Sequence, residues 1–239
     1  AVGHHYSLTS LFIRKCPKFV YFPEGGFLAP KLVLCCIEEL KNLKSLPEKM
    51  QILFPSLTYL LIKCCPQVKS FPEGGLPSNL KYLDVLQCPK LMASRMGWHL
   101  RSLTSLQYLG IGDVDDKSLP DIGLLPPTLI GLVVHNCPNL RSLQHKGLCH
   151  LSSLESLGFF DCPKLQYFPK EGLPSSLCQL LIIRCPLLKR RIQKHKGKYW
   201  AKISHIPFVG FDDYVIQTFS DELLTLEGVS FRTIHSLIS

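Results

Sequence analysis

Cysteine and histidine are the residues of this sequence whose types could support metal binding or nucleophilic catalysis. The chain has eleven cysteines and nine histidines in 239 residues. A zinc site brings about four such ligands around one ion and commonly uses close pairs such as Cys-x-x-Cys. Here most cysteines recur singly, and the adjacent pairs Cys35-Cys36 and Cys64-Cys65 would point to opposite sides of a strand. We therefore expect structural cysteines, with a metal or thiol protein as the less favoured alternative.

Cys149 and His150 are neighbours in the sequence and could suggest a nucleophile with its base. Adjacent residues rarely present the required geometry, and no orienting Asn or Asp accompanies them in a catalytic pattern. We expect this pair to lie in a link between two structural units. The sequence thus predicts no catalytic, metal-binding or cofactor-binding residue, and we expect the chain not to be an enzyme.

The cysteines belong to a phrase that the chain repeats. "CPQVKSFPEGGLPSNLKYL" begins at Cys65 and "CPKLQYFPKEGLPSSLCQL" begins at Cys162. Alignment of the phrases gives eight copies, whose equivalent positions are Cys16, Leu40, Cys65, Cys88, Val114, Cys137, Cys162 and Cys185. The period in the low-to-mid twenties, with the pattern Leu-x-x-Leu-x-Ile/Val-x-x-Cys, is typical of leucine-rich repeats.

The repeat predicts a strand in each copy, as in Tyr59 to Lys63. Alternation along the strand sends Leu60 and Ile62 inward and leaves Tyr59, Leu61 and Lys63 facing outward. Such a strand buries its apolar side only by stacking on its neighbours. We expect an α/β repeat solenoid, namely a leucine-rich repeat horseshoe with a parallel concave β-sheet and a mostly irregular, Pro-rich convex side.

Three segments are expected along the chain. Residues 1–193 form about eight leucine-rich coils, and residues 194–210 form a C-terminal capping segment. Within the cap, Trp200, Ile203 and Ile206 have helix-compatible spacing and could cover the last coil. Residues 211–239 lose the pattern and are expected to be a divergent, poorly ordered tail. Because the chain begins at Ala1 without Met, we also expect it to be a fragment.

The outward strand positions are the candidate protein-binding residues, since solenoids bind partners on their concave surface. Tyr59, Tyr82 and Tyr108 share one column on consecutive coils, and tyrosine offers broad contact area at low entropic cost. The alternative is that this apolar face covers another domain of the same protein. The candidates are Phe12, Arg14, Tyr59, Leu61, Lys63, Tyr82, Asp84, Leu86, Tyr108, His135, Phe160, Leu181 and Ile183.

The distribution of charged and apolar residues bears on two classes of partner, nucleic acids and membranes. The net charge is +9, and six basic residues fall within positions 189–198. No nucleic-acid motif accompanies that run, so we interpret it as a solvated helix face and expect no nucleic-acid partner. No apolar run reaches the length of about 20 residues that a membrane span needs. The odd number of cysteines and the lack of Asn-X-Ser/Thr sites favour a reducing, cytoplasmic location.

The repeated Cys-Pro and Gly-Leu-Pro-Ser phrases, together with the closing "CPLLKRRIQKHKGKYWAKISHIP", resemble one family over roughly residues 7 to 210. It is the C-terminal leucine-rich repeat region of plant nucleotide-binding (NB-ARC) leucine-rich repeat disease-resistance proteins of the coiled-coil class. The resemblance implies an intracellular immune receptor that recognises a pathogen effector or a guarded host protein. It also implies that the repeats restrain an upstream nucleotide-binding domain.

The chain departs from a full receptor because it has no Gly-x-x-x-x-Gly-Lys-Ser/Thr loop. ATP or ADP is therefore expected only in a missing upstream domain, and no cofactor is assigned to this chain. A different interaction protein, the substrate-recognition repeats of an F-box type ubiquitin-ligase adaptor, is the alternative to the receptor.

Overall fold

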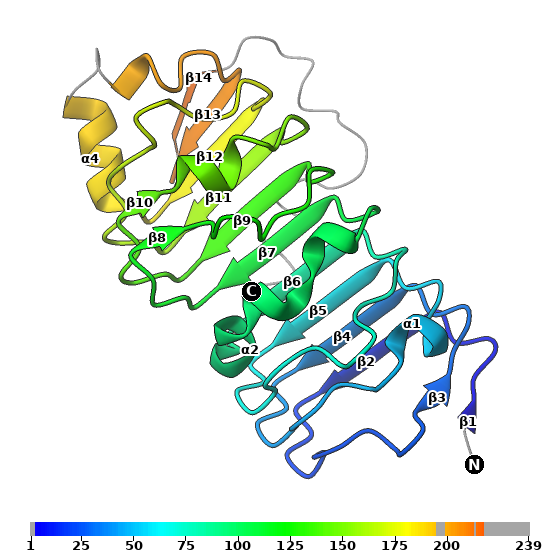
Figure 1. Ribbon diagram of the computed structural model, residues 1–239. Helices are drawn as coiled ribbons and strands as arrows, with labels where there is room; N and C mark the ends of the chain where they lie inside the picture. Colours follow the sequence, from blue (N-terminus) through cyan, green and yellow to red (C-terminus); the bar gives the residue numbers. More distant parts are fainter. Residues whose placement is uncertain (1–2, 195–198, 213, 218–239) are drawn as a thin grey trace.

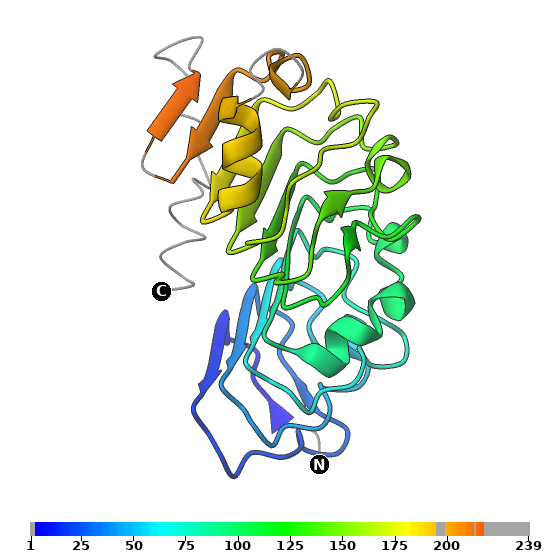
Figure 2. The same ribbon diagram turned by 90° about the vertical axis from the view of Figure 1, so that its left-hand side faces the viewer.

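The protein is a curved solenoid built around one ten-stranded sheet (Figures 1 and 2). A computed structural model describes residues 3–194, 199–212 and 214–217. Nine strands run parallel, and the tenth, β14, pairs antiparallel with β13. The strands are β2 (Ser10–Arg14), β4 (Leu34–Glu38), β5 (Tyr59–Lys63), β6 (Tyr82–Leu86), β7 (Tyr108–Gly112), β9 (Gly131–His135), β11 (Ser156–Phe160), β12 (Gln179–Ile183), β13 (Phe208–Phe211) and β14 (Tyr214–Gln217).

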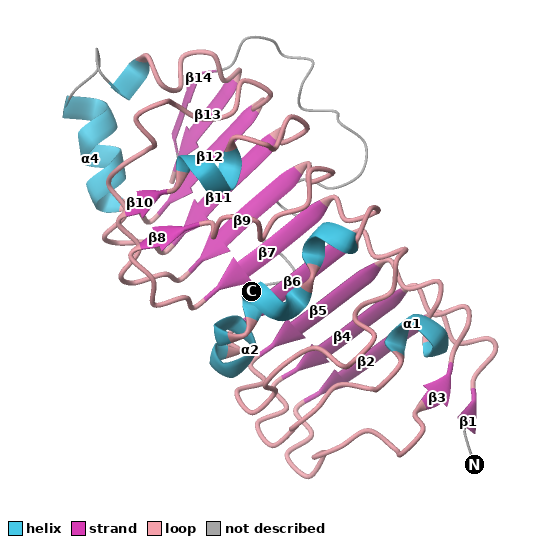
Figure 3. Ribbon diagram, viewed as in Figure 1, coloured by secondary structure: helices cyan, strands magenta, loops and turns pink. Residues whose placement is uncertain are grey.

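The convex side is made mostly of loops and short turns (Figure 3). Its longest regular element is α4 (Pro186–Lys194) near the C-terminal end of the stack. The remaining elements are brief: β1 (Gly3–His4), β3 (Phe27–Leu28), α1 (Met50–Leu53), α2 (Pro89–Ala93), two 3₁₀ turns (Arg95–Trp98 and Leu100–Ser102), β8 (Ser118–Leu119), α3 (His145–Leu148) and β10 (Ser142–Leu143). The predicted solenoid, with a parallel concave sheet and an irregular convex side, is confirmed.

The strands stack in the register that the repeat alignment predicts. Tyr59 pairs with Tyr82 and Tyr82 with Tyr108, so the three tyrosines occupy equivalent positions. The eight aligned copies correspond to eight strands of this sheet, namely β2, β4, β5, β6, β7, β9, β11 and β12. β13 extends the same parallel sheet past the last copy, because Phe208 pairs with Gln179.

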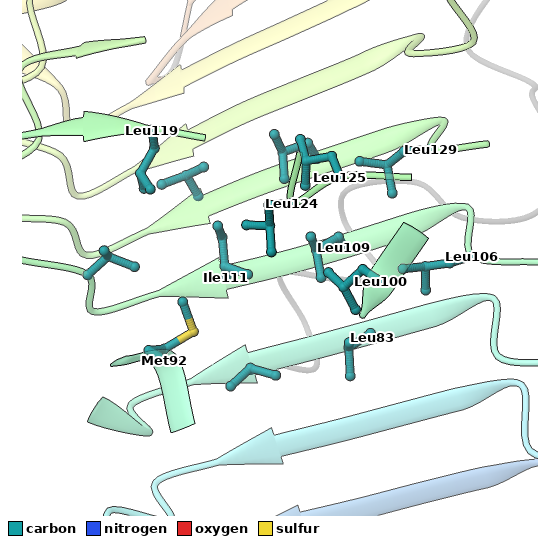
Figure 4. Packing of buried hydrophobic residues seen from close by; sticks show 14 of the residues in the cluster. Leu83, Met92, Leu100, Leu106, Leu109, Ile111, Leu119, Leu124, Leu125 and Leu129 are labelled. Atoms are coloured by element: carbon teal, nitrogen blue, oxygen red, sulfur yellow. The ribbon is translucent and has the colours of Figure 1, made fainter. Parts of the chain in front are cut away.

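The core lies between the sheet and the convex side. In β5, the inward side chains of Leu60 and Ile62 are completely buried, and the other coils from β4 to β12 repeat this arrangement, whereas Leu11 and Ile13 of the first strand, β2, are partly buried. Figure 4 shows leucines of consecutive coils, among them Leu83, Leu109 and Leu129, packed against one another. A fully buried leucine contributes about 2 kcal/mol to the free energy of folding. The core therefore forms only when neighbouring coils are in contact.

Each of the nine parallel strands of the large sheet is followed by a residue with left-handed backbone conformation. These residues have φ between 45° and 61°, and they directly follow the strands. Asn and Asp tolerate this conformation better than other residues with a side chain, and they occupy four of the nine positions. The positions are Lys15, Glu39, Cys64, Gln87, Asp113, Asn136, Asp161, Arg184 and Asp212.

The predicted cap and tail are described only in part. Ile203 and Ile206 are completely buried in the common core, and Trp200 packs against it. Residues 195–198 of the cap and residues 213 and 218–239 of the tail lie outside the described residues. The expected boundary at residue 210 falls inside β13. The division into repeats, cap and tail stays a prediction.

Arg95 connects two coils on the convex side. Its side chain is 11% exposed, and its Nε donates a hydrogen bond to Asp121 Oδ2 at 2.6 Å. It also forms an ion pair with Asp116 and donates to the carbonyl of Met92 at 3.2 Å. A buried guanidinium needs such partners because removal of its charge from water is costly. Arg95 thus ties the turn after α2 to the following coil.

We expect Arg95→Ala to lower the free energy of unfolding by about 2 kcal/mol, because it removes the hydrogen bonds of a buried guanidinium to the half-buried Asp121 and to the carbonyl of Met92. Urea unfolding followed by circular dichroism measures this loss. Arg101→Ala is the matched control, since Arg101 is exposed on the neighbouring turn and should change stability by less than about 0.5 kcal/mol. Equal stability of the two variants would contradict a structural role for Arg95.

Candidate interaction surface on the concave sheet

The outward side chains of the sheet form three parallel columns on its concave face. The strand register places the first, third and fifth residues of each five-residue strand beside the equivalent residues of the next strand. All thirteen candidate residues lie in these columns. The first column holds Tyr59, Tyr82 and Tyr108, the second holds Phe12, Leu61, Asp84 and Leu181, and the third holds Arg14, Lys63, Leu86, His135, Phe160 and Ile183.

The three tyrosines form a continuous aromatic ladder. The ring centroids of Tyr59 and Tyr82 are 6.0 Å apart at an interplanar angle of 35°. Those of Tyr82 and Tyr108 are 4.9 Å apart, and their planes differ by 5°. Offset or parallel aromatic pairs at this spacing are attractive beyond the area that they bury. The ladder is therefore a partly rigid feature of the surface, and all three side chains remain partly exposed.

Glycines at outward positions of β7 and β9 allow large side chains of the preceding strand to lean over them. A Cβ atom at Gly131 would lie 2.5 Å from Tyr108 Cδ1, and one at Gly110 would lie 1.9 Å from Asp84 Oδ1. Both distances are shorter than real side-chain contacts. The absent side chains thus leave the space that the Tyr108 ring and the Asp84 carboxylate occupy.

Four of the thirteen candidates are buried, although they occupy the outward strand positions as predicted. They are Leu61, Asp84, Leu86 and Phe160, each less than 9% exposed. Leu61 and Leu86 form a second small apolar cluster with Cys36, against which Leu34 and Tyr59 pack. Phe160 stacks on His135 with centroids 5.0 Å apart. This burial has a physical cause: neighbouring strands bring bulky outward side chains close enough to cover one another.

The remaining candidates reach the surface to different extents. Phe12 is 53% exposed at the first strand. Arg14 is exposed and forms an ion pair with Glu38 at 2.8 Å, and its guanidinium lies over the Phe12 ring. Lys63, His135, Leu181 and Ile183 are partly buried. Their placement on one face agrees with the predicted surface, while their binding role stays a prediction.

Asp84, on β6, is a buried carboxyl group in the middle column of this face. Tyr59 Oη donates a hydrogen bond to Asp84 Oδ2 at 3.1 Å. Burial raises the pKa of Asp84 from 3.8 to about 6, and the hydrogen bond from Tyr59 opposes the shift. Burial also raises the pKa of Tyr59, with a further contribution from the Asp84 charge. The face therefore contains a carboxylate that burial destabilises.

The repeated cysteines have a structural environment. Cys65, Cys88, Cys162 and Cys185 are buried, and each thiol donates to the carbonyl two residues earlier and to one on a preceding coil. Burial raises the pKa of the Cys35 thiol to about 12. Within the described residues, no three Cys, His, Asp or Glu side chains converge as a metal site would require. These contacts favour the structural interpretation of the cysteines.

Cys149 and His150 do not face each other as a catalytic pair would. His150 Nε2 lies 3.0 Å from the carbonyl oxygen of Leu125, and the Cys149 thiol is directed to the carbonyl of Lys146 at 3.9 Å. Both residues lie just after α3 in the connection to the next coil. The contacts match the expected link between coils.

The strand-end column carries a ladder of polar contacts that the sequence analysis missed. Asp113 accepts from the Gln87 backbone N–H at 2.6 Å and from the Asn136 side chain at 2.5 Å. Arg184 binds Asp161 through two hydrogen bonds, and its backbone N–H donates to Asp212. The signal was present as a polar residue before the Cys-Pro pair, as in "NCP", "DCP" and "RCP". These contacts stabilise the rim of the concave face.

Comparison with known proteins gives one informative similarity. No protein-family profile matches the chain. The chain is similar to an Arabidopsis thaliana protein named "Putative disease resistance protein", with 40% identity over 193 residues. The aligned residues are 80% of this chain, and they cover 13% of the relative's length. The chain is thus related to a plant disease resistance protein and spans a small part of its length.

None of the helices in the described part of the chain is long and apolar enough to cross a membrane.

The raised pKa of Asp84 predicts a specific pH dependence. The folded protein holds the Asp84 proton more tightly than the unfolded chain, so stability from this group is present at low pH and is lost as pH rises from about 4 to about 6. Asp84→Asn removes this loss. We expect the stability gain of the variant to be about 2 kcal/mol larger at about pH 7.5 than at about pH 4.5. Urea unfolding at both values measures it, and a gain that does not change with pH would refute the shift.

Thiol titration tests the structural role of the cysteines. We expect rapid reaction of DTNB with the exposed Cys16, Cys149 and Cys178, slower reaction of the half-buried Cys64, and reaction of the seven buried thiols only after denaturation. The triple variant Cys16→Ser, Cys149→Ser, Cys178→Ser should lose the rapid phase. Rapid reaction of buried thiols, or unfolding upon addition of a chelator, would support the metal or thiol alternative.

Proposed function

We propose that this chain, which is related to a plant disease resistance protein, is the protein-interaction and recognition module of an intracellular immune receptor. The supporting observation is the 40% identity over 80% of the chain, together with the repeat solenoid on which it lies. Because the chain spans 13% of the relative, the activity of a whole receptor enters only through this proposal.

In this proposal the concave face makes the contact with a partner. Tyrosine is enriched among residues that dominate binding energy, and Tyr59, Tyr82 and Tyr108 present a pre-stacked set of rings. A preorganised surface loses less side-chain entropy on binding than a flexible one. The partner is a pathogen effector or a guarded host protein, and the module acts by binding, without catalysis of its own.

The same face can also restrain the receptor in its resting state. Packing against an upstream nucleotide-binding domain would hold that domain inactive until an effector competes for the surface, since a ligand shifts an equilibrium through its differential affinity for two states. ATP or ADP would bind only in that upstream domain. A cytoplasmic location agrees with the eleven cysteines, all of which are free thiols in the structure.

The experiment uses the full-length gene product expressed transiently in leaves, with cell death as the readout. We expect Tyr82→Ala combined with Tyr108→Ala to change receptor signalling at least about tenfold, through loss of pathogen-dependent cell death or through constitutive cell death, because each hot-spot tyrosine contributes about 2 kcal/mol. Tyr21→Ala is the matched control, since Tyr21 is 57% exposed outside the sheet. Immunoblots verify equal protein levels.

Parent-like behaviour of the double variant, both at rest and after pathogen challenge, would contradict the proposed role of this face. A leaf response that is the same with and without the whole gene would contradict the defence function itself.

A further inference from the structure

Among the residues that the structure describes, no cation pairs with Asp84 on the concave face. It is one of two charged residues that are buried in the described part of the chain, the other being Arg95. Arg95 has two carboxylates as partners, whereas none of the ion pairs among the described residues includes Asp84. A buried carboxylate without a cation carries a desolvation cost that one tyrosine hydroxyl offsets only in part. The fold retains this cost at the centre of its proposed binding surface.

The second oxygen of this carboxylate lies against β7, beside Gly110. Oδ2 accepts the hydrogen bond from Tyr59, which leaves Oδ1. Oδ1 lies 1.9 Å from the position that a Cβ atom of Gly110 would take. The outward Cβ positions define the concave face, so Oδ1 occupies the place of the missing Gly110 side chain on β7. Asp84 is 8% exposed, so a partner group can reach this acceptor oxygen only through the space that Gly110 leaves without a side chain.

Two aromatic rings lie in the neighbouring column of the same face. Tyr82 precedes Asp84 by two residues on β6, and Tyr108 precedes Gly110 by two residues on β7. The two rings are parallel at 4.9 Å and form a flat stack beside the carboxylate. Tyrosine rings attract cations over their faces and stack with planar guanidinium groups. A carboxylate beside stacked tyrosines is therefore complementary to arginine more than to a neutral side chain.

We propose that the concave face takes the guanidinium group of an arginine from a separate protein partner, with Asp84 Oδ1 as acceptor and the Tyr82–Tyr108 stack beside it. This inference rests on the proposed recognition role of the face and specifies the chemistry of its partner. Guanidinium suits the site because its planar donors can bind a carboxylate while its face lies along an aromatic ring.

The other groups of this face determine how the site responds to pH. The titratable or charged side chains that face Asp84 from its own and the flanking strands are Cys36, Glu38, Tyr59, Lys63, Tyr82 and Tyr108. Glu38 is already paired with Arg14. Burial raises the pKa of Cys36 to about 11 and that of Tyr108 above its ordinary value, so neither ionises between about pH 5 and 7.5. Asp84, with a pKa of about 6, is the group whose ionisation should control binding in this range.

The test uses this chain with ¹³C-labelled tyrosine and the peptide N-acetyl-Gly-Arg-Gly-amide as the probe. We expect the peptide to shift the resonances of Tyr82 and Tyr108 in a saturable manner. Its affinity should fall about tenfold between about pH 7.5 and about pH 5, because the ionised fraction of Asp84 falls from nearly all to about a tenth. The same peptide with citrulline in place of arginine is isosteric and neutral, and it should not shift these resonances.

Two variants and one control separate the Asp84 site from general electrostatics. Asp84→Asn should weaken binding of the arginine peptide at least about tenfold at about pH 7.5 and remove the pH dependence. Gly110→Ala keeps the carboxyl group but displaces Oδ1, so it should also weaken binding. Glu73→Gln, an exposed position outside the sheet, should leave the affinity unchanged.

Equal affinity in Asp84→Asn and the parent, equal response to the citrulline peptide, or pH-independent binding would each overturn the arginine site. None of these outcomes concerns defence signalling, so the peptide result can fail while the proposed receptor function stands, and the reverse also holds.

In the full-length receptor, Asp84→Asn should abolish pathogen-dependent cell death without constitutive activity. Constitutive cell death would instead assign the arginine to the receptor's own upstream domain and overturn the assignment to a separate partner.

Discussion

The parallel pairing of each strand with the equivalent strand of the next coil is the constraint on which the rest of this structure depends. A single coil has one five-residue strand and a long irregular return, and it has no means to bury its leucines alone. Pairing brings the inward side chains of adjacent coils into contact, as Leu60 and Leu83 show. Because the register is constant, equivalent residues of successive coils lie side by side along the stack.

The concave surface follows from that register. Side chains at equivalent positions are forced to lie about 4.8 Å apart, which is close for two large groups. The chain accommodates them in two ways: aromatic rings stack, as in Tyr82 and Tyr108, or a large side chain leans over a glycine, as Asp84 does over Gly110. The resulting face is more closely packed than an open sheet of outward side chains. Its shape is set by neighbours in the stack rather than by neighbours in the sequence.

The rim of the sheet uses a different set of interactions. After each parallel strand of the large sheet, one residue adopts the left-handed conformation, and in four coils a cysteine follows whose thiol lies near backbone carbonyls of its own and a preceding coil. A small, weakly polar side chain suits this buried turn, because it satisfies a carbonyl without the desolvation cost of a charged group. The repeated cysteines are therefore explained by the turn. The candidate binding residues lie in other positions of the same repeat.

The sequence by itself determined the repeat, its inward and outward positions, and the column that contains Tyr59, Tyr82 and Tyr108. Alternation along a strand and a nearly constant period are local properties, so they can be read from one chain. Only the tertiary structure decided that Leu61 and Asp84 are buried, that β13 extends the sheet, and that Asp84 lies over Gly110. These features depend on how large side chains of adjacent strands share the space between them. Residue type and strand position do not specify that sharing, because the partners are some 23 to 26 residues apart and their contacts form only when the coils stack.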